Sequence, residues 1–408
     1  MSLVLNTNIS SLQAQNNLTK SGSELSTATE DLSSGLQINS AADNAAGFAI
    51  ATRFQTQIGG LSQASQNASD AINLSQTAGS ALDQVTSNLQ SIRDLAVQAA
   101  NGTYQSSDRA AINTEVQQSL SEITRIANQT SFNGTNVLNG SVSSLSFQIG
   151  SNVGQAINVQ LGQGVTASQV GQISEVSTGN ISGAFVTSGG ATTGGTLSLS
   201  GLSITGADGT AYTFTGGTAG SAQDVADAIN AADVNGVSAA VSDNGGINIY
   251  SQGSLSVNGA AVTGSASAAA SGFTTFTTAA TGTGTTAGVY GSGAYTDGAS
   301  LAAGGSLAGS DVLTVDDANQ LISRIDAALT SVSTFSSTLG AIQNRFQSAI
   351  STLGAQQTNL TASQSSIQDT NFAAETATLS QAQVLQQAGI SVLATANSEP
   401  QNILKLLQ

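Results

Sequence analysis

Cysteine, histidine and tryptophan are absent from this chain of 408 residues. Without cysteine the chain has no disulfide, no thiolate metal ligand and no cysteine nucleophile. Without histidine it lacks the commonest general base and the commonest metal ligand. We therefore expect no catalytic residue, no metal site and no cofactor, and a structural role is favoured over an enzymatic one.

Basic residues are scarce as well, because 8 Lys and Arg stand against 24 Asp and Glu and give a formal net charge of −16. This charge opposes binding to nucleic acid or to anionic lipid. The chain contains no run of about eighteen apolar residues, the length that spans a bilayer. Its first residues, MSLVLNTNISSLQAQNN, lack the basic start and apolar run of a secretory signal peptide. We expect no nucleic-acid partner, no membrane insertion and no cleaved signal.

Aromatic residues make up only 4% of the chain, so its core must consist of Ala, Leu, Ile and Val, which suit closely packed helices. Composition also changes along the sequence, since no basic residue lies between Arg125 and Arg324. That central part is rich in Gly, Ser and Thr with short alternating runs, whereas both ends follow a helical period. Two helical ends therefore flank a β-rich insert.

Three segments place apolar or small residues at alternating spacings of three and four, the pattern of a packed helical seam. They are Ala78, Leu82, Val85, Leu89, Ile92, Ala96 and Ala99; Ile112, Val116, Ser119, Ile123 and Ile126; and Leu321, Ile325, Ala328, Val332, Phe335, Leu339, Ile342, Phe346, Ala349 and Leu353. The last segment would be roughly 50 Å long as a helix and cannot bury its stripe alone. We expect a mainly α fold, in which the two halves form a long antiparallel coiled-coil-like bundle with a β hairpin and an outward-facing β/α insert.

The extreme ends carry thinner stripes, in which Ala, Gly and polar residues share the seam with Leu. These stripes are Leu18, Gly22, Leu25, Thr29 and Leu32, and then Leu379, Ala382, Leu385, Gly389, Val392 and Ala396. Such seams bury little area, so isolated terminal helices are marginal. The pattern leaves two readings open, an intramolecular coiled coil or packing between subunits.

The insert contains a predicted ββαββ unit at about residues 195–252. A strand from Thr196 to Ile204 turns at Gly206 to Gly209, a helix follows around Val225, and a second hairpin turns at Asp243 to Gly246. The low-complexity stretch that comes next has GxG pieces, but no strand precedes them and no helix follows, so they predict no phosphate loop. The carboxylates Asp208, Asp224, Asp227, Asp233 and Asp243 are interpreted as solvated charges.

Short motifs occur in order along both ends of the chain. They are Leu5 to Asn8, Leu32 to Ala41, Ala45 to Gly47, Leu89 to Gln98, Phe132 to Gly134, Val137-Leu138 and Phe147 to Gly150, followed by Asp369 to Ala373, Leu385 to Gly389 and Pro400 to Leu404. In these motifs the chain resembles bacterial flagellins over roughly residues 1–175 and 310–408. The ββαββ unit resembles the insert motif of flagellins and hook-associated proteins.

The resemblance implies a secreted subunit that polymerises with itself into the extracellular filament used for motility, with terminal helices that order on assembly. It also implies as partners the flagellar export apparatus, an export chaperone, the filament cap and hook-associated proteins. It divides the chain into inner-tube helix and spoke (1–44), bundle and β hairpin (45–175), surface insert (176–309), bundle (310–361) and inner-tube helix (362–408).

The helical seams and the family resemblance together predict which residues pack between subunits and which contact receptors. The expected subunit-packing residues are Leu18, Leu25, Leu32, Leu89, Ile92, Arg93, Leu95, Leu339, Leu385, Val392, Leu404 and Leu407. Arg93, Leu95 and Glu115 match positions at which flagellins contact host innate immune receptors, and bundle packing or surface charge is the alternative interpretation. Gln37, Ala42, Ser91 and Gln408 stand where the family often has a basic residue.

Three other functions are compared with a filament subunit. A hook–filament junction protein is disfavoured because junction proteins usually lack the combination of the Leu89 and Pro400 motifs. A secreted adhesin would bind a surface through the Ser/Thr-rich insert. An enzyme resembling the flagellins with a metalloprotease insert would need HExxH, which cannot exist without histidine.

Overall fold

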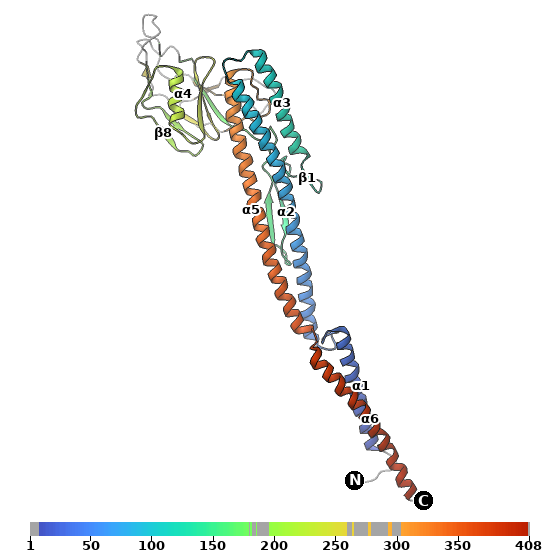
Figure 1. Cartoon of the computed structure of the whole chain (residues 1–408). Coiled ribbons are helices and arrows are strands. Elements are labelled where there is room, and N and C mark those ends of the chain that lie inside the picture. The colour runs from blue at the N-terminus through green and yellow to red at the C-terminus, as the bar shows by residue number, and fades with distance from the viewer. Residues whose placement is uncertain are drawn as a thin grey trace. The chain divides into compact units, whose positions relative to one another are not determined.

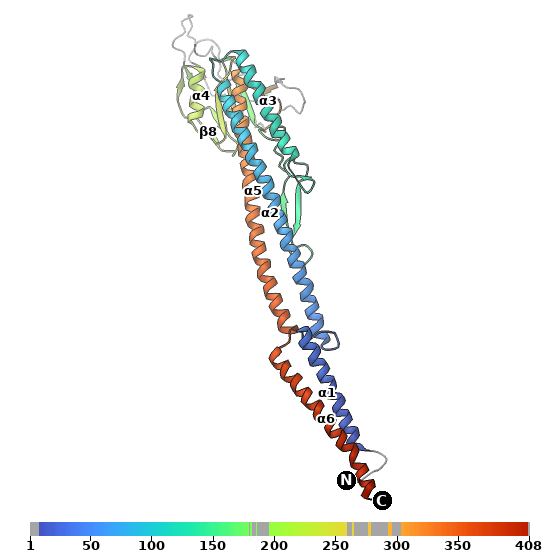
Figure 2. The ribbon, with the colours of Figure 1, turned by 45° about the vertical axis from the view of Figure 1, so that its right-hand side comes forward.

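A computed structural model describes residues 8–178, 180–181, 185, 196–258, 263–264, 276–278, 293–295 and 303–406. The chain folds into two compact units (Figures 1 and 2). The terminal unit combines Met1–Ser69, Gln148–Ala156 and Ser348–Gln408, and the central unit combines Asp70–Phe147 and Ile157–Gln347. The predicted fold class is confirmed: the chain is mainly helical, its terminal helices pack against each other, and a β-containing insert lies between them.

The terminal unit is built on helices α1 (Ile9–Ser34) and α6 (Phe372–Leu406), which run antiparallel. Near one end, Asn8 Nδ2 donates to the Ala396 carbonyl at 2.8 Å, and near the other an isolated antiparallel bridge joins Leu36 to Asp369. Asn8 caps α1 by accepting from the Ser11 amide, and Gly35 ends it with φ 75°, a left-handed conformation that glycine adopts without strain.

Two long helices, α2 (Ala45–Ala99) and α5 (Val315–Gln368), contribute to both units and are antiparallel. In the terminal unit, Leu61 and Ala64 near the start of α2 form a buried cluster with Leu353 near the end of α5. In the central unit, Arg93 near the end of α2 contacts Asp326 near the start of α5. Helix α3 (Ser106–Gln129) lies beside this pair in both views, so the central unit contains a three-helix bundle.

The bundle core follows the predicted seams closely. All seven seam residues of α2 from Ala78 to Ala99 are buried. In α5 the predicted residues are buried except Ala349, which is half-buried. In α3 the predicted residues Ile112, Val116 and Ile123 are buried, but Leu120 and Ala127 are buried where Ser119 and Ile126 were expected. This shift follows from the 3.6-residue turn of a straight helix, which drifts away from a strict 3.5-residue repeat.

Two β hairpins follow α3. The first pairs β1 (Ser131–Phe132) with β2 (Thr135–Asn136), and Asn133 and Gly134 both have positive φ at its turn, as a tight primed turn requires. The second pairs β3 (Ser144–Gln148) with β4 (Ala156–Gln160). Phe147 of β3 stacks edge-on against Phe346 of α5 at a centroid distance of 5.8 Å, which fixes this strand to the bundle.

The insert begins at β5 (Ser174–Thr178), and its base is closed by paired backbone hydrogen bonds between Ile173 and Gly304. Its other elements are β6 (Leu197–Ser198), β7 (Ser203–Thr205), β8 (Ala211–Thr213), β9 (Thr218–Ala219), α4 (Ala222–Ala231), β10 (Val237–Val241), β11 (Ile247–Ser251), β12 (Ser256–Asn258), β13 (Thr263–Gly264), β14 (Phe276–Thr278) and β15 (Gly293–Tyr295). These strands form sheets in the orders β10-β11-β5-β14-β15, β12-β7-β8 and β13-β6-β9.

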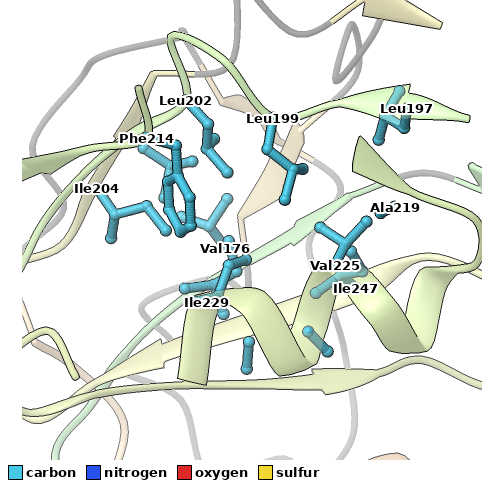
Figure 3. Close-up of a cluster of buried hydrophobic side chains, with 14 of the residues drawn as sticks. Val176, Leu197, Leu199, Leu202, Ile204, Phe214, Ala219, Val225, Ile229 and Ile247 are labelled. Atoms are coloured by element: carbon cyan, nitrogen blue, oxygen red, sulfur yellow. The ribbon is translucent and has the colours of Figure 1, made fainter. Parts of the chain in front are cut away.

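A separate hydrophobic core holds the insert together. Figure 3 shows Val225 and Ile229 of α4 gathered with Val176 of β5 and Ile247 of β11. The predicted strand from Thr196 to Ile204 is wrong as a single element, because Gly201, with φ 86°, turns the chain between β6 and β7. Most of the low-complexity stretch after residue 264 lies outside the described residues.

Candidate assembly surface

Helices α1 and α6 meet through small side chains. The buried residues of α1 are Ser11, Ala14, Ser21, Ala28 and Asp31, and those of α6, up to residue 398, are Ala382 and Ala396. Leu18 packs over Gly389, where an added Cβ atom would lie 3.2 Å from the Leu18 side chain. Small residues therefore permit the close approach of these two helices, and their side chains contribute less apolar burial than fully buried leucines would.

Large apolar side chains lie on the uncovered surface of the same two helices. They are Ile9, Leu12, Phe372, Val384, Leu385, Ile390 and Val392, and their exposed fractions run from 45% to 64%. We use the name apolar face of the terminal helices for these seven exposed residues together, although on α6 they lie on both flanks of the helix. An isolated exposed leucine is ordinary in proteins, but a set of this size on one helix pair indicates a surface that other molecules cover.

The predicted packing residues of the ends occupy two different environments. Leu18, Leu25 and Leu32 are half-buried between the terminal helices, whereas Leu385 and Val392 are exposed. In the predicted stripe of α6, Ala382 and Ala396 are buried, but Gln386 and Leu393 are half-buried in place of Leu385 and Val392. For Leu404 only the helical backbone is described, and Leu407 lies outside the described residues.

The loop after α1 forms a joint with the end of α5 that the sequence patterns do not reveal. The Gln37 amide donates to the Gln368 carbonyl at 2.7 Å, and the Gln37 side chain donates to the Ile367 carbonyl at 2.8 Å. The Thr370 amide donates to the Gly35 carbonyl at 2.9 Å. Backbone pairing of this kind leaves no hydrophobic period, so only the glycine at the end of α1 signals it.

The remaining predicted residues belong to the central bundle. Leu89, Ile92 and Leu339 are at most 1% exposed in the bundle core, and Leu95 is half-buried. Arg93 Nε donates to Asp326 Oδ1 at 2.7 Å, and this hydrogen bond and the charge of Asp326 raise the pKa of Arg93. Glu115 is exposed on α3.

The five aspartates of the insert that were interpreted as solvated charges are all exposed. Asp208 accepts from the Thr210 amide at 2.9 Å in a turn, and this hydrogen bond lowers its pKa. Asp224 binds the Gly220 amide before α4. Within the described ranges, no three Asp or Glu side chains gather closely enough to hold a metal ion. None of the described helices combines the length and apolarity needed to cross a membrane.

These features define a class of protein, a helical structural subunit. Its bundle carries a separate insert, and its paired terminal helices leave large apolar residues uncovered. The sequence matches the family described as "Bacterial flagellin N-terminal helical region" over residues 5–143 and the one described as "Bacterial flagellin C-terminal helical region" over residues 322–407.

Sequence relatives cover the whole chain. The chain is 37% identical to a B-type flagellin of Pseudomonas aeruginosa and 38% identical to a flagellin of Salmonella typhimurium, in each case over 100% of both chains. It is also similar to the solved structure of FliC from Burkholderia pseudomallei, with 28% identity, 67% of this chain and 99% of that chain covered, and a TM-score of 0.38. From the sequence matches, the chain belongs to the bacterial flagellin family and is a structural subunit of the flagellar filament.

Proposed function

We propose that this subunit polymerises with copies of itself through the apolar face of its terminal helices, and that the polymer is an extracellular filament used for motility. The observation that carries the proposal is the division of α1 and α6 into a small-residue line, which pairs the two helices, and an uncovered set of large apolar residues. Covering side chains that are about half exposed contributes on the order of 1 kcal/mol for each of them.

Order in the terminal helices is proposed to depend on assembly. The α1–α6 pair buries mainly Ala and Ser, and such contacts offset little of the entropy lost when a helix forms. Neighbouring subunits that cover Val384, Leu385 and Val392 supply the missing burial, so folding of the ends is coupled to binding. Leu404 and Leu407 are proposed to extend the same surface.

The family layout supports a proposal for each part of the chain. Residues 1–44 and 362–408 would form the inner tube, 45–175 and 310–361 the surrounding shell, and 176–309 an outward-facing insert. Each subunit would contact the next through different patches at its two ends, because a non-closing head-to-tail contact produces a helical filament.

Further partners are proposed from the family resemblance. Export through the flagellar secretion apparatus, with a chaperone and without signal cleavage, is supported by the absence of cysteine, since no disulfide has to form or break. The filament cap and hook-associated proteins would contact the polymer ends. Arg93, Leu95 and Glu115 are proposed contacts for innate immune receptors, although Arg93 already binds Asp326. A non-enzymatic role is supported by the lack of histidine and cysteine.

A charge within the apolar face tests the assembly proposal. Val392 is 58% exposed, so Val392→Asp leaves the isolated subunit folded but places a carboxylate where a neighbour would bury it without a partner, and we expect polymer formation to be lost. Sedimentation of polymerised protein measures this, and circular dichroism of the monomer checks its folding.

Asn244→Asp is the matched control, because it adds the same charge to an exposed loop of the insert. Normal polymerisation of Val392→Asp would exclude this face as the assembly surface.

Long polymers from the purified parent chain distinguish a filament subunit from a hook–filament junction protein. An adhesin would be identified if deletion of the insert abolished surface binding while assembly persisted.

A further inference from the structure

The insert contacts the first turns of α5 through acidic side chains that belong to both elements. Asp316 Oδ2 accepts hydrogen bonds from Ser242 Oγ at 2.7 Å and from the Asp243 amide at 2.9 Å, both in the turn between β10 and β11. One turn further along α5, Gln320 Nε2 donates to a carboxylate oxygen of Glu175 on β5 at 2.5 Å. Two carboxyl groups therefore take part in the contact between the insert and the bundle, beside a buried cluster of Ile173, Tyr250 and Ala327.

Glu175 is only 8% exposed, although it is a charged residue type. On the sheet it pairs with Tyr250 of β11, and from α5 it faces Gln320, Arg324, Asp316 and Asp317. Burial raises the pKa of Glu175, and the two aspartates raise it further. The Gln320 hydrogen bond and the Arg324 charge lower the pKa, but the pKa of Glu175 stays above its ordinary value, so this environment disfavours the charged form relative to water.

Asp316 is subject to the same effect. Its Oδ1 atom is buried and finds no hydrogen-bond partner among the residues that the structure describes. Burial is the largest cause that raises its pKa, the Ser242 and Asp243 donors lower it, and with the charges of Asp243 and Asp317 the pKa of Asp316 lies above its ordinary value. Nearby, burial and Asp317 also raise the pKa of Asp311, in the segment before α5. The charged form of these groups is therefore costly at this contact.

We propose that the contact between the insert and α5 is an acid-strengthened latch, in which protons on Glu175 and Asp316 hold β5 and the β10–β11 turn against the helix. Docking favours the protonated acids, and undocking exposes them to water, where they ionise more readily. The contribution of these two groups to docking is therefore fully present below the ordinary carboxyl pKa of 4.5 for Glu175 and 3.8 for Asp316, and is lost as the pH rises through their higher pKa values in the docked state. This property belongs to the subunit and is independent of assembly.

Hydrogen exchange of the monomeric full-length chain tests the latch. The measurement runs from about pH 4 to about pH 8, a range that includes ordinary and raised carboxyl pKa values. After correction for intrinsic exchange rates, protection of residues 237–251 should fall as the pH rises, by up to about tenfold for each pKa unit that docking displaces, whereas protection of residues 78–99 in α2 should stay constant. In Glu175→Gln, a neutral side chain of the same shape, the insert should lose less protection at high pH than it does in the parent chain.

Asp227→Asn is the matched control, since Asp227 is exposed on α4 in the same insert, and it should keep the pH dependence of the parent. Asp316→Asn should reduce that dependence in part. An unchanged pH dependence in Glu175→Gln would overturn the proposal. Loss of protection in this variant at every pH would also overturn it, because a neutral group at this position should favour docking.

Discussion

The bundle concentrates its largest buried side chains in one stretch of α5. Phe335, Leu339 and Phe346 are 2%, 1% and 0% exposed, and they follow one another at the spacing of a helical seam. Interiors of this kind are closely packed, so a side chain of a different size or charge cannot be accommodated without a large loss of stability.

Leu339→Asp is expected to unfold the central unit. An ionised carboxylate at this position would be buried among apolar residues, which costs several kcal/mol, and a domain of this kind is stable by only about 5–15 kcal/mol. Circular dichroism melts of the purified monomer measure the loss. Ser337→Asp, two positions along on the exposed face of α5, is the matched control, and equal melting temperatures for the two variants would show that Leu339 is not part of the core.

At the scale of elements, the insert is attached to the bundle at a narrow base. Ile173 and Gly304 exchange backbone hydrogen bonds of 3.1 and 2.9 Å, so the chain enters and leaves the insert at adjacent positions. The core formed by α4 and the insert strands contains no residue of the bundle helices. The insert meets α5 through a smaller buried cluster of Ile173, Tyr250 and Ala327 and through polar contacts that include the Glu175–Gln320 hydrogen bond.

The narrow base of the insert predicts that the insert can be removed without unfolding the bundle. Replacing residues 174–303 by Asn-Gly, which forms a two-residue hairpin turn, should leave the bundle folded and able to polymerise. Deletion from about residue 180 would instead leave β5 without its partner β11. Electron microscopy and thermal melts check both properties. A variant that keeps the bundle folded but forms no polymer would show that inserts hold subunits together.

The long helices could be predicted from the sequence because their cores are large apolar residues with a regular period. Leu82, Leu89 and Leu339 belong to such seams, and all three are buried. The faces of the terminal helices could not be predicted in the same way. When alanine, serine and glycine form the contact, the apolar period is only partly correct: within the predicted stripe of α6, Ala382 and Ala396 are buried, whereas Leu385 and Val392 are exposed.

Contacts made by single polar groups were equally hidden in the sequence. The Gln37 side chain donates to the Ile367 carbonyl from a position 330 residues away in the chain, and no local pattern encodes such a pairing. The burial of Glu175 was missed for the same reason, because a carboxylate within an alternating strand is expected to face solvent. Its place beside Gln320 depends on how the insert docks on α5.

At the scale of the whole molecule, the central part of the chain and its two ends differ in their surface residues. The chain carries a formal net charge of −16, and no basic residue lies between Arg125 and Arg324. The central part is therefore acidic and suited to contact with water, whereas the exposed large apolar residues gather mainly on α1 and α6. The account predicts that polymerisation covers the ends of the chain and leaves the insert accessible.

Hydrogen exchange on monomer and polymer tests this central claim most directly. In the monomer, residues 9–34 and 372–398 should exchange rapidly, because the α1–α6 pair buries mainly small side chains, and residues 78–99 should be protected. In the polymer the terminal residues should become as protected as the bundle, while residues 203–213 of the insert should not change. Equal protection of the terminal helices in monomer and polymer would contradict the claim that the uncovered apolar face is completed by neighbouring subunits.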